Sequence, residues 1–292
     1  MITIGKGWKI FYRLSVNIRK NHHRGGTVEL EYEDRIVVFL DVLGFSNFTN
    51  YTGATQVNQS KKIETINNYL EMLHKFFSPK NAIAKSRMVT SFSDSIVLSI
   101  KEEDIDDFDV ELLEIYYLLI NSIMKGFLIR GAIVYGKLIH TKNIIFGPAL
   151  VEAYNRESKI AKYPRVIVDD AIVKDLNDLP NDKPREHRNL IQYDTDGMQY
   201  IDLFHDISVR LDNFRQHAQF LLAYTGILLE NLNNPKLVEK TTWLKEKLSH
   251  YFDYYGEILN FSLDSDMTEL DIEALRGFVY QFDTEEYERK AP

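Results

Sequence analysis

The sequence has no cysteine among its 292 residues. This absence excludes a disulfide framework and any metal site built from thiolates. Long apolar runs are missing as well, since no stretch approaches the roughly 20 apolar residues that span a bilayer. We therefore expect a cytoplasmic protein with no part in the membrane, and a reducing compartment agrees with the missing cysteine.

Acidic residues are missing from the first 28 positions, although in the whole chain they outnumber basic residues by 43 to 35. The net charge of -8 argues against a general nucleic-acid binder, because an acidic surface repels a phosphate backbone. We expect the basic start, residues 1–32, to be a solvated arm. We do not expect a secretory signal there, because Arg13 and Arg19 interrupt its apolar residues.

The composition is that of a globular protein, with 45% hydrophobic residues that include 17 Phe and 17 Tyr. An apolar, β-branched run at 35–41 is typical of a strand buried on both faces. Further elements are predicted in this order: a helix at 61–77, strands at 88–92 and 96–100, a helix at 110–124 and a strand at 127–136. This β-α-β-β-α-β order predicts an α+β fold with a ferredoxin-like sheet that carries both helices on one face.

The rest of the chain predicts smaller elements and a helical end. We expect a helix at 149–161 and a strand at 165–168. Residues 173–200 are rich in Asn, Asp and Pro, which indicates a loop or linker. Two long helical patterns, at 208–232 and 236–259, predict a hairpin packed on the sheet or on a partner subunit. The expected organisation is a basic arm at 1–32, an α+β domain at 33–172, the linker, and a mainly helical region at 201–292.

Two acidic residues stand at corresponding ends of the predicted strands. Asp41 ends the first strand, and Asp94 occupies the tip of the hairpin between the next two strands. The β-α-β-β topology brings these two points side by side. Carboxylates packed together repel, and one takes up a proton unless cations keep both ionised. Because oxygen ligands suit hard ions, the pair predicts a site for two divalent cations, Mn²⁺ or Mg²⁺.

The residues after Asp41 predict an anion-binding turn. The backbone amides of Leu43, Gly44, Phe45 and Ser46 open a short helical turn, where free donors and the helix dipole favour anions. Gly44 would allow close approach of a phosphate, or it would serve the turn alone. A triphosphate could dock here.

Three segments together carry a family resemblance. Residues 39–46 read Phe-Leu-Asp-Val-Leu-Gly-Phe-Ser, residues 91–95 read Ser-Phe-Ser-Asp-Ser, and residues 130–136 read Arg-Gly-Ala-Ile-Val-Tyr-Gly. This pattern resembles that of the class III nucleotide cyclases. The segments 146–157 and 161–168 sharpen the match, because they resemble the pyrimidine cyclases of bacterial Pycsar antiphage defence. The resemblance covers residues 33 to 170.

The resemblance implies an activity and an assembly. It implies a catalytic domain that converts UTP or CTP to the 3′,5′-cyclic monophosphate and pyrophosphate, as a second-messenger generator in antiphage defence. Asp41, Asp94 and the carbonyl of Val42 would hold two Mn²⁺ or Mg²⁺ ions, and the enzyme would be a head-to-tail homodimer. The implied positions are Asp41, Asp94, Arg130, Asn155 and Arg156 for catalysis, and Phe39, Val42, Leu43, Gly44, Phe45, Ser46 and Thr90 for nucleotide binding.

The departures from the purine cyclases bear on the substrate. Val151 stands where those enzymes carry a ribose-orienting Asn, and Asn155 stands where they carry a phosphate-binding Arg. Arg130 and Arg156 are the candidates to replace the missing charge. Thr90 stands in place of a base-reading Lys, and its hydroxyl suits a smaller base without distinguishing uracil from cytosine. Within the resembled group, UTP is favoured over CTP.

Other functions stay open at this point. A purine cyclase is one alternative, and a degenerate domain that binds nucleotide or acts as a scaffold is another. A diguanylate cyclase or a polymerase palm shares a related unit, but the sequence has no Gly-Gly-Asp-Glu-Phe tip. His140 and the other isolated histidines show no metal-ligand spacing, and we expect them at the surface or in packing contacts.

Overall fold

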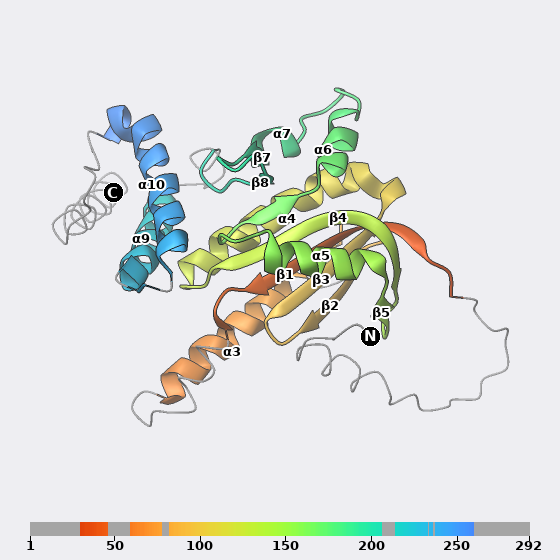
Figure 1. Cartoon of the computed structure of the whole chain (residues 1–292), viewed down its shortest axis with the longest axis horizontal. Helices are drawn as coiled ribbons and strands as arrows, with labels where there is room; N and C mark the ends of the chain where they lie inside the picture. The colour runs from red at the N-terminus through yellow and green to blue at the C-terminus, as the bar shows by residue number, and fades with distance from the viewer. Residues whose placement is uncertain are drawn as a thin grey trace, which may run out of the picture.

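The computed structural model describes residues 30–45, 59–77, 82–205, 214–232, 234–235 and 237–259. A single mixed sheet forms the centre of this part, and helices lie on both of its faces (Figure 1). The predicted basic arm lies outside the described residues except for its last three positions. Ser46 also lies outside them.

The first six elements follow the predicted order. They are β1 (Glu33–Val42), α3 (Gln59–Phe76), β2 (Met88–Phe92), β3 (Ser95–Lys101), α4 (Ile105–Met124) and β4 (Ile129–His140). Their strands lie in the order β2-β3-β1-β4, and each neighbouring pair is antiparallel. This is the ferredoxin-like arrangement. The predicted α+β fold class is therefore confirmed.

The sheet continues beyond the ferredoxin-like unit. β6 (Val166–Val168) pairs parallel with β4, and β8 (Gln199–Ile201) and β7 (Ile191–Tyr193) follow in the same sheet. A two-residue strand, β5 (Ile145–Phe146), pairs with the end of β4. The strand predicted at 165–168 is thus present as β6, parallel to β4 and antiparallel to β8.

The segment 173–200 is not the loop or linker that its composition indicated. It holds most of α6 (Asp170–Asn177), all of α7 (His187–Leu190), β7 and the start of β8. Its Asn, Asp and Pro residues form the turns between these short helices and strands, so the composition indicated turns and not a domain boundary. The division of the chain into a domain at 33–172 and a helical region at 201–292 stays a prediction.

Alternation along β1 divides the core between two layers. Ile36, Val38 and Leu40 face the larger core, which includes side chains of α3 and α4. Val37 and Phe39 face a smaller core that is covered by α5 (Pro148–Lys159). Both helices of the ferredoxin-like unit therefore lie on one face, as predicted, and α5 lies on the other.

Helix α4 begins earlier than its apolar pattern indicated. It starts at Ile105, so Asp106 and Asp107 lie in its first turn, whereas the pattern predicted a start at Val110. Acidic side chains stabilise a helix N-terminus through the helix dipole. These two acids therefore belong to the helix and stabilise its start.

Two long helices form the described end of the chain. They are α9 (Phe214–Leu232) and α10 (Val238–Leu259), and they lie next to each other at one end of the sheet and close to α4 (Figure 1). Trp243 of α10 stacks on Tyr163, with ring centroids 5.6 Å apart. The predicted hairpin is thus packed on this chain's own sheet. In the described part of the chain, no helix has both the length and the apolar character needed to cross a bilayer.

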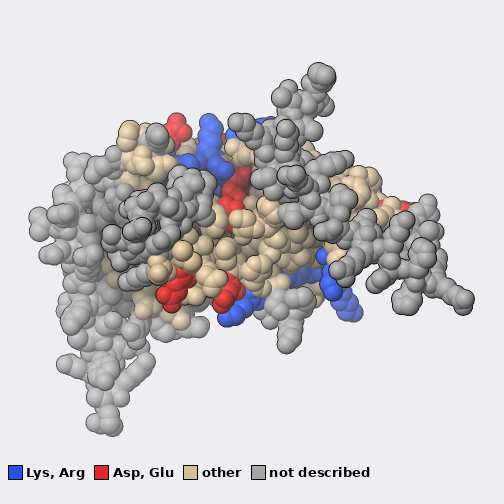
Figure 2. Space-filling view, turned by 90° about the horizontal axis from the view of Figure 1, so that it is seen from below, with Lys and Arg blue, Asp and Glu red and all other residues tan. Residues whose placement is uncertain are grey.

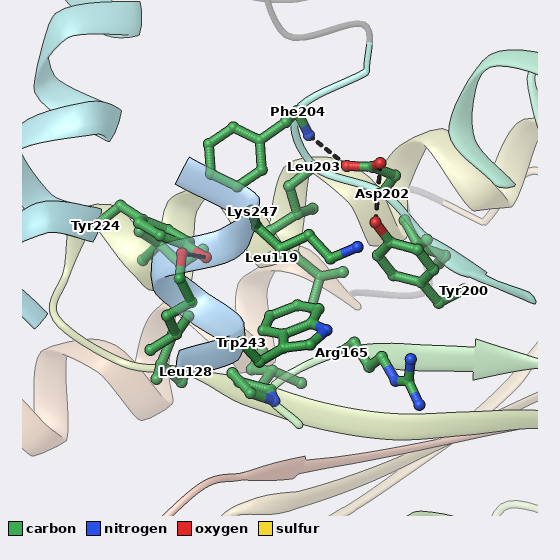
Figure 3. Close-up of a pocket in the computed structure, with 15 residues that line it drawn as sticks. Leu119, Leu128, Arg165, Tyr200, Asp202, Leu203, Phe204, Tyr224, Trp243 and Lys247 are labelled. Carbon is green, nitrogen blue, oxygen red and sulfur yellow. Dashed lines mark hydrogen bonds between the residues drawn. The ribbon is translucent and has the colours of Figure 1, made fainter. Parts of the chain in front are cut away.

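The buried carboxylate of Asp194 joins α10 to the sheet. It accepts hydrogen bonds from Trp243 Nε1 and Lys247 Nζ, each at 2.8 Å, and it also pairs with Arg165. Burial opposes ionisation of Asp194, but the bonds from Lys247 and Trp243 hold its pKa below the ordinary value. Figure 3 shows Trp243 and Lys247 reaching from α10 toward Tyr200 and Arg165. The cavity among these side chains measures about 20 Å³, which is room for a single water.

Asp194→Ala is expected to lower the free energy of unfolding by about 3 kcal/mol, because it leaves Lys247 buried without its carboxylate partner and leaves Arg165 with only the partly exposed Asp196. Urea denaturation followed by circular dichroism measures the change. Asp182→Ala is the matched control, since Asp182 is 72% exposed and its buried partner Arg185 keeps its pair with Asp106. Equal stability of the two variants would contradict the role assigned to Asp194.

Candidate active site

Strand pairing brings Asp41 and Asp94 to the same end of the sheet. Asp41 lies opposite Ser95 in the register of β1 with β3, and Asp94 directly precedes Ser95 in the β2–β3 turn. The Val42 amide donates to the Asp94 carbonyl at 3.3 Å, and Ser95 Oγ donates to Asp41 Oδ1 at 2.7 Å. Two residues that are distant in the sequence therefore form one acidic site.

The environment of Asp41 disfavours its negative charge. Burial raises its pKa, and the nearby charge of Asp94 adds to this shift, whereas the Ser95 hydrogen bond and Arg130 oppose it. Among the described residues, no three His, Asp or Glu side chains gather as a metal site. Two carboxylates with a nearby backbone carbonyl still fit Mg²⁺ or Mn²⁺, because such ions keep water and phosphate oxygens as their other ligands. The residues present thus suit a divalent cation that is shared with a phosphorylated substrate.

The turn after β1 differs from the prediction at one amide. The Leu43 N–H donates to the Leu128 carbonyl at 2.8 Å, so it serves the fold and is removed from the predicted phosphate-binding set. Gly44 has φ of 77°, a left-handed conformation that favours glycine. Phe45 begins a helical turn, and its side chain is buried. Phosphate binding by the amides of Gly44 and Phe45 stays a prediction.

Phe39 is also not available to a nucleotide through its side chain. It is buried under α5, with its ring edge-on to Tyr154 at 5.8 Å between centroids. The phenylalanine of the sequence pattern therefore supports the packing of α5 on the sheet. Val42 is likewise buried, and it faces the larger core.

Arg130 lies next to Asp41, and a buried acid holds it. Arg130 is opposite Asp41 in the register of β1 with β4, and its guanidinium pairs with Glu157 of α5. Burial raises the pKa of Glu157, Arg130 opposes this shift, and the charge of Asp41 adds to it. Lys240 of α10 lies close enough to Arg130 and Glu157 for their charges to act on it. Burial and the charge of Arg130 lower the pKa of Lys240, and the charge of Glu157 opposes this shift. Charges of alternating sign thus extend from Asp41 to the C-terminal helices.

Glu157 and Lys240 are not among the site residues that the sequence predicted. Glu157 follows Ala153 by four residues, so helical periodicity places both on the buried face of α5. That position was the available signal for an acid with a partner. Nothing in the local sequence around Lys240 indicates its neighbours.

Arg156 and Asn155 have partners of their own on the outer side of α5. Arg156 Nε donates to Glu152 at 2.8 Å, and its Nη2 lies 3.0 Å from Asp169. The Asn155 carboxamide oxygen accepts a bond from Lys159 at 2.9 Å. These contacts do not bring either side chain to Asp41 within the described part of this chain. Their catalytic roles stay predictions.

Thr90 lies on the same face of the sheet as Asp41. It pairs with Val97 of β3, which in turn pairs with Phe39 of β1. Thr90 is half-buried, and its Oγ1 lies 2.9 Å from Nε2 of the buried His140. Burial and the charge of Arg35 lower the pKa of His140 to about 4. His140 is therefore a neutral packing residue, one of the two environments expected for it.

The described surface is mostly uncharged in the view of Figure 2, and its acidic and basic side chains gather in small groups. Exposed apolar side chains include Tyr32, Phe146, Val151 and Tyr154. Tyr32 and Phe146 contact each other edge-on, with centroids 5.9 Å apart. Val151 and Tyr154 belong to α5, so apolar surface remains on the side of the sheet that carries Asp41.

Comparisons with known proteins identify only solved structures. No protein-family model and no curated protein matches the sequence. The adenylyl cyclase CyaB from P. aeruginosa is 14% identical over 60% of this chain and 95% of its own, with a TM-score of 0.42. The guanylyl cyclase domain of the RhoGC fusion protein from Blastocladiella emersonii is 16% identical over 59% of this chain and 95% of its own, with a TM-score of 0.39.

The adenylate/guanylate cyclase/hydrolase from Silicibacter pomeroyi gives a similar result. It is 15% identical over 59% of this chain and 98% of its own, with a TM-score of 0.38. Because these identities and TM-scores are low, the assignment of function rests on the residues of the site.

The buried His140 predicts a loss of stability in acid. Its pKa of about 4 in the folded chain lies below the ordinary value near 6.5, so the unfolded chain binds the proton first. The contribution of the neutral ring to the free energy of unfolding is present in full above about pH 6.5. It decreases by about 2 kcal/mol between pH 7.5 and pH 5. His140→Gln lacks this pH-dependent contribution. The difference in free energy of unfolding between wild type and the variant, measured by urea titration, should therefore shrink toward pH 5. A difference that is constant with pH would contradict the buried neutral ring.

Proposed function

We propose that this chain is a nucleotide cyclase that closes UTP, or CTP, into the 3′,5′-cyclic monophosphate and releases pyrophosphate. The observation that carries this proposal is that strand pairing brings Asp41 and Asp94 to one end of a ferredoxin-like sheet, close enough for the charge of Asp94 to act on Asp41. The resemblance of the surrounding segments to class III cyclases agrees with it. Membership in the pyrimidine cyclase group of antiphage defence, and a role as a second-messenger generator there, are parts of the same proposal.

The acidic pair would hold the metal ions, with the Val42 carbonyl as a further ligand. Two bound Mg²⁺ or Mn²⁺ ions would lower the pKa of the ribose 3′-hydroxyl and offset the charge of the triphosphate. Ser95 orients Asp41 through its 2.7 Å hydrogen bond. Arg130 lies opposite Asp41 and pairs with Glu157. When substrate is bound, its guanidinium would also contact the phosphates.

The size of the base-facing side chain supports a pyrimidine. Thr90 takes the position of a lysine in the purine cyclases, and its side chain is too short to reach as far. Its single hydroxyl is suited to one polar edge of a base. UTP is favoured over CTP, and purine nucleotides are the alternative substrates.

A homodimer with two equivalent sites completes the proposal. Apolar side chains in α5 and just before it, Val151 and Phe146, are 40% and 44% exposed. Exposed apolar residues of this kind are typical of a surface that meets a partner. Head-to-tail association through this side would bring Arg156 and Asn155 of one subunit toward the acids of the other.

One observation favours a second function. Arg130 is paired with Glu157, and Arg156 is paired with Glu152 and Asp169, so the cations near the site already have acidic partners. A domain that binds nucleotide without turnover, or that serves as a scaffold, would tolerate this neutralisation. Both acids that a cyclase needs are nevertheless present and adjacent.

Asp41→Asn or Asp94→Asn is expected to reduce turnover by at least about 100-fold, because each removes a charged metal ligand while keeping the side-chain size. The assay incubates the purified protein with each of the four ribonucleotides and Mn²⁺, and it measures pyrophosphate and the cyclic product. Asp34→Asn is the matched control, since Asp34 is an exposed acid on the same strand. Wild-type turnover in either site variant would refute the metal assignment, and no product from wild type would favour the scaffold.

Phe146→Asp is expected to weaken the dimer and to lower activity at low protein concentration, because it places a charge on the proposed interface. Sedimentation velocity and product formation over a dilution series measure both effects. Tyr193→Asp should change neither, since Tyr193 is 72% exposed on β7, at the far edge of the sheet. Full activity in a monomeric wild-type protein would contradict the shared site.

A further inference from the structure

We propose that His140 is a positioning residue that fixes the direction of the Thr90 hydroxyl, so that Thr90 donates a hydrogen bond to the base and selects one with a carbonyl oxygen at that edge. Uracil is the pyrimidine that meets this requirement. The inference rests on the proposed function, because it takes Thr90 to face the base.

The hydrogen-bond network begins at Arg35, whose guanidinium can only donate. Arg35 Nε donates to Ser99 Oγ at 2.9 Å, and a guanidinium has no acceptor. Arg35 is itself buried and is also held by Glu33 and by the Ser86 carbonyl. Ser99 Oγ is therefore fixed as an acceptor on the Arg35 side.

The Ser99 hydrogen then determines the tautomer of His140. Ser99 has no exposed surface, and its Oγ lies 2.7 Å from His140 Nδ1. If Nδ1 accepts this hydrogen, every buried donor in the chain of contacts is satisfied. The opposite tautomer would give Ser99 two incoming hydrogens and leave its own without an acceptor among the described contacts, which is unfavourable in a buried site. A neutral His140 with Nδ1 as acceptor carries its hydrogen on Nε2.

The Thr90 hydroxyl accepts a hydrogen bond from His140, so its own hydrogen points away from the imidazole ring. His140 Nε2 donates to Thr90 Oγ1 across 2.9 Å, which occupies one of the two lone pairs of the hydroxyl. The Thr90 hydrogen must point away from the imidazole N–H. Among the described residues no other partner of this hydroxyl is present, and Thr90 is only half-buried on the face that carries Asp41. The network therefore leaves Thr90 as a donor toward the open face.

A donor at this position discriminates between bases by their edges. A carbonyl oxygen, as in uracil, accepts the hydrogen bond, whereas the amino group of cytosine presents hydrogens to a hydroxyl that is already turned as a donor. A mismatched polar contact of this kind disfavours binding because a group is left unpaired. The expected result is a preference for UTP over CTP that does not depend on any charged side chain.

The enzymatic test compares kcat/KM for UTP and CTP in four proteins. Wild type should prefer UTP, and Thr90→Val, which keeps the shape but loses the hydroxyl, should reduce the UTP to CTP ratio by about tenfold. Thr90→Ser should retain most of the preference. His140→Phe should reduce the ratio as Thr90→Val does while both substrates are still cyclised, because Thr90 keeps its hydroxyl but loses its fixed direction.

A direct test of the network uses ¹⁵N NMR of the histidine rings in the full chain at neutral pH, with His140→Gln to assign the signal. We expect the tautomer with hydrogen on Nε2, and a hydrogen on Nδ1 or a protonated ring would overturn the inference. A wild-type enzyme that prefers CTP, or a UTP to CTP ratio unchanged in Thr90→Val and His140→Phe, would overturn it while leaving the cyclase proposal intact. A wild type inactive on every nucleotide would overturn both.

Discussion

The register of β1 between β3 and β4 is the constraint on which the site depends. It sets Asp41 opposite Ser95 on one side and opposite Arg130 on the other. A slip of one residue would turn every side chain of the strand to the other face. The burial of Ile36 and Leu40 in the larger core opposes such a slip. Hydrophobic packing on one face thus determines where the acid stands on the other.

The partly buried charge of Asp41 is offset by a row of neighbouring side chains of alternating charge. Arg130 lies beside the acid, Glu157 neutralises Arg130, and the field of Lys240 acts on both. Lys240 belongs to the helix that Asp194 anchors to the sheet through Lys247. The helical end of the chain is therefore coupled electrostatically to the region of the acids, although it is far from them in sequence. A buried charge of either sign needs such a partner, because an unpaired one would be strongly unfavourable.

The polar network at Thr90 solves a different problem, because it fixes the direction of a neutral hydroxyl. A hydroxyl that can rotate offers a ligand both a donor and an acceptor, and so it discriminates poorly between bases. Contacts that begin at Arg35, which only donates, remove this freedom before any ligand arrives. Fixed dipoles of this kind need no reorganisation on binding. The acids and the hydroxyl share one sheet face but are held by independent sets of contacts.

The sequence by itself determined the elements of the ferredoxin-like unit, their order and the strand-end positions of Asp41 and Asp94, because hydrophobic periodicity and turn residues act over short distances along the chain. Only the tertiary structure decided that residues 173–200 extend the sheet, that Phe39 is buried under α5, and that the Leu43 amide bonds to Leu128. The pairing of Arg130 with Glu157 and of Thr90 with His140 was also decided there. These contacts join residues far apart in the chain, and their formation depends on strand register and helix packing, which no local pattern encodes.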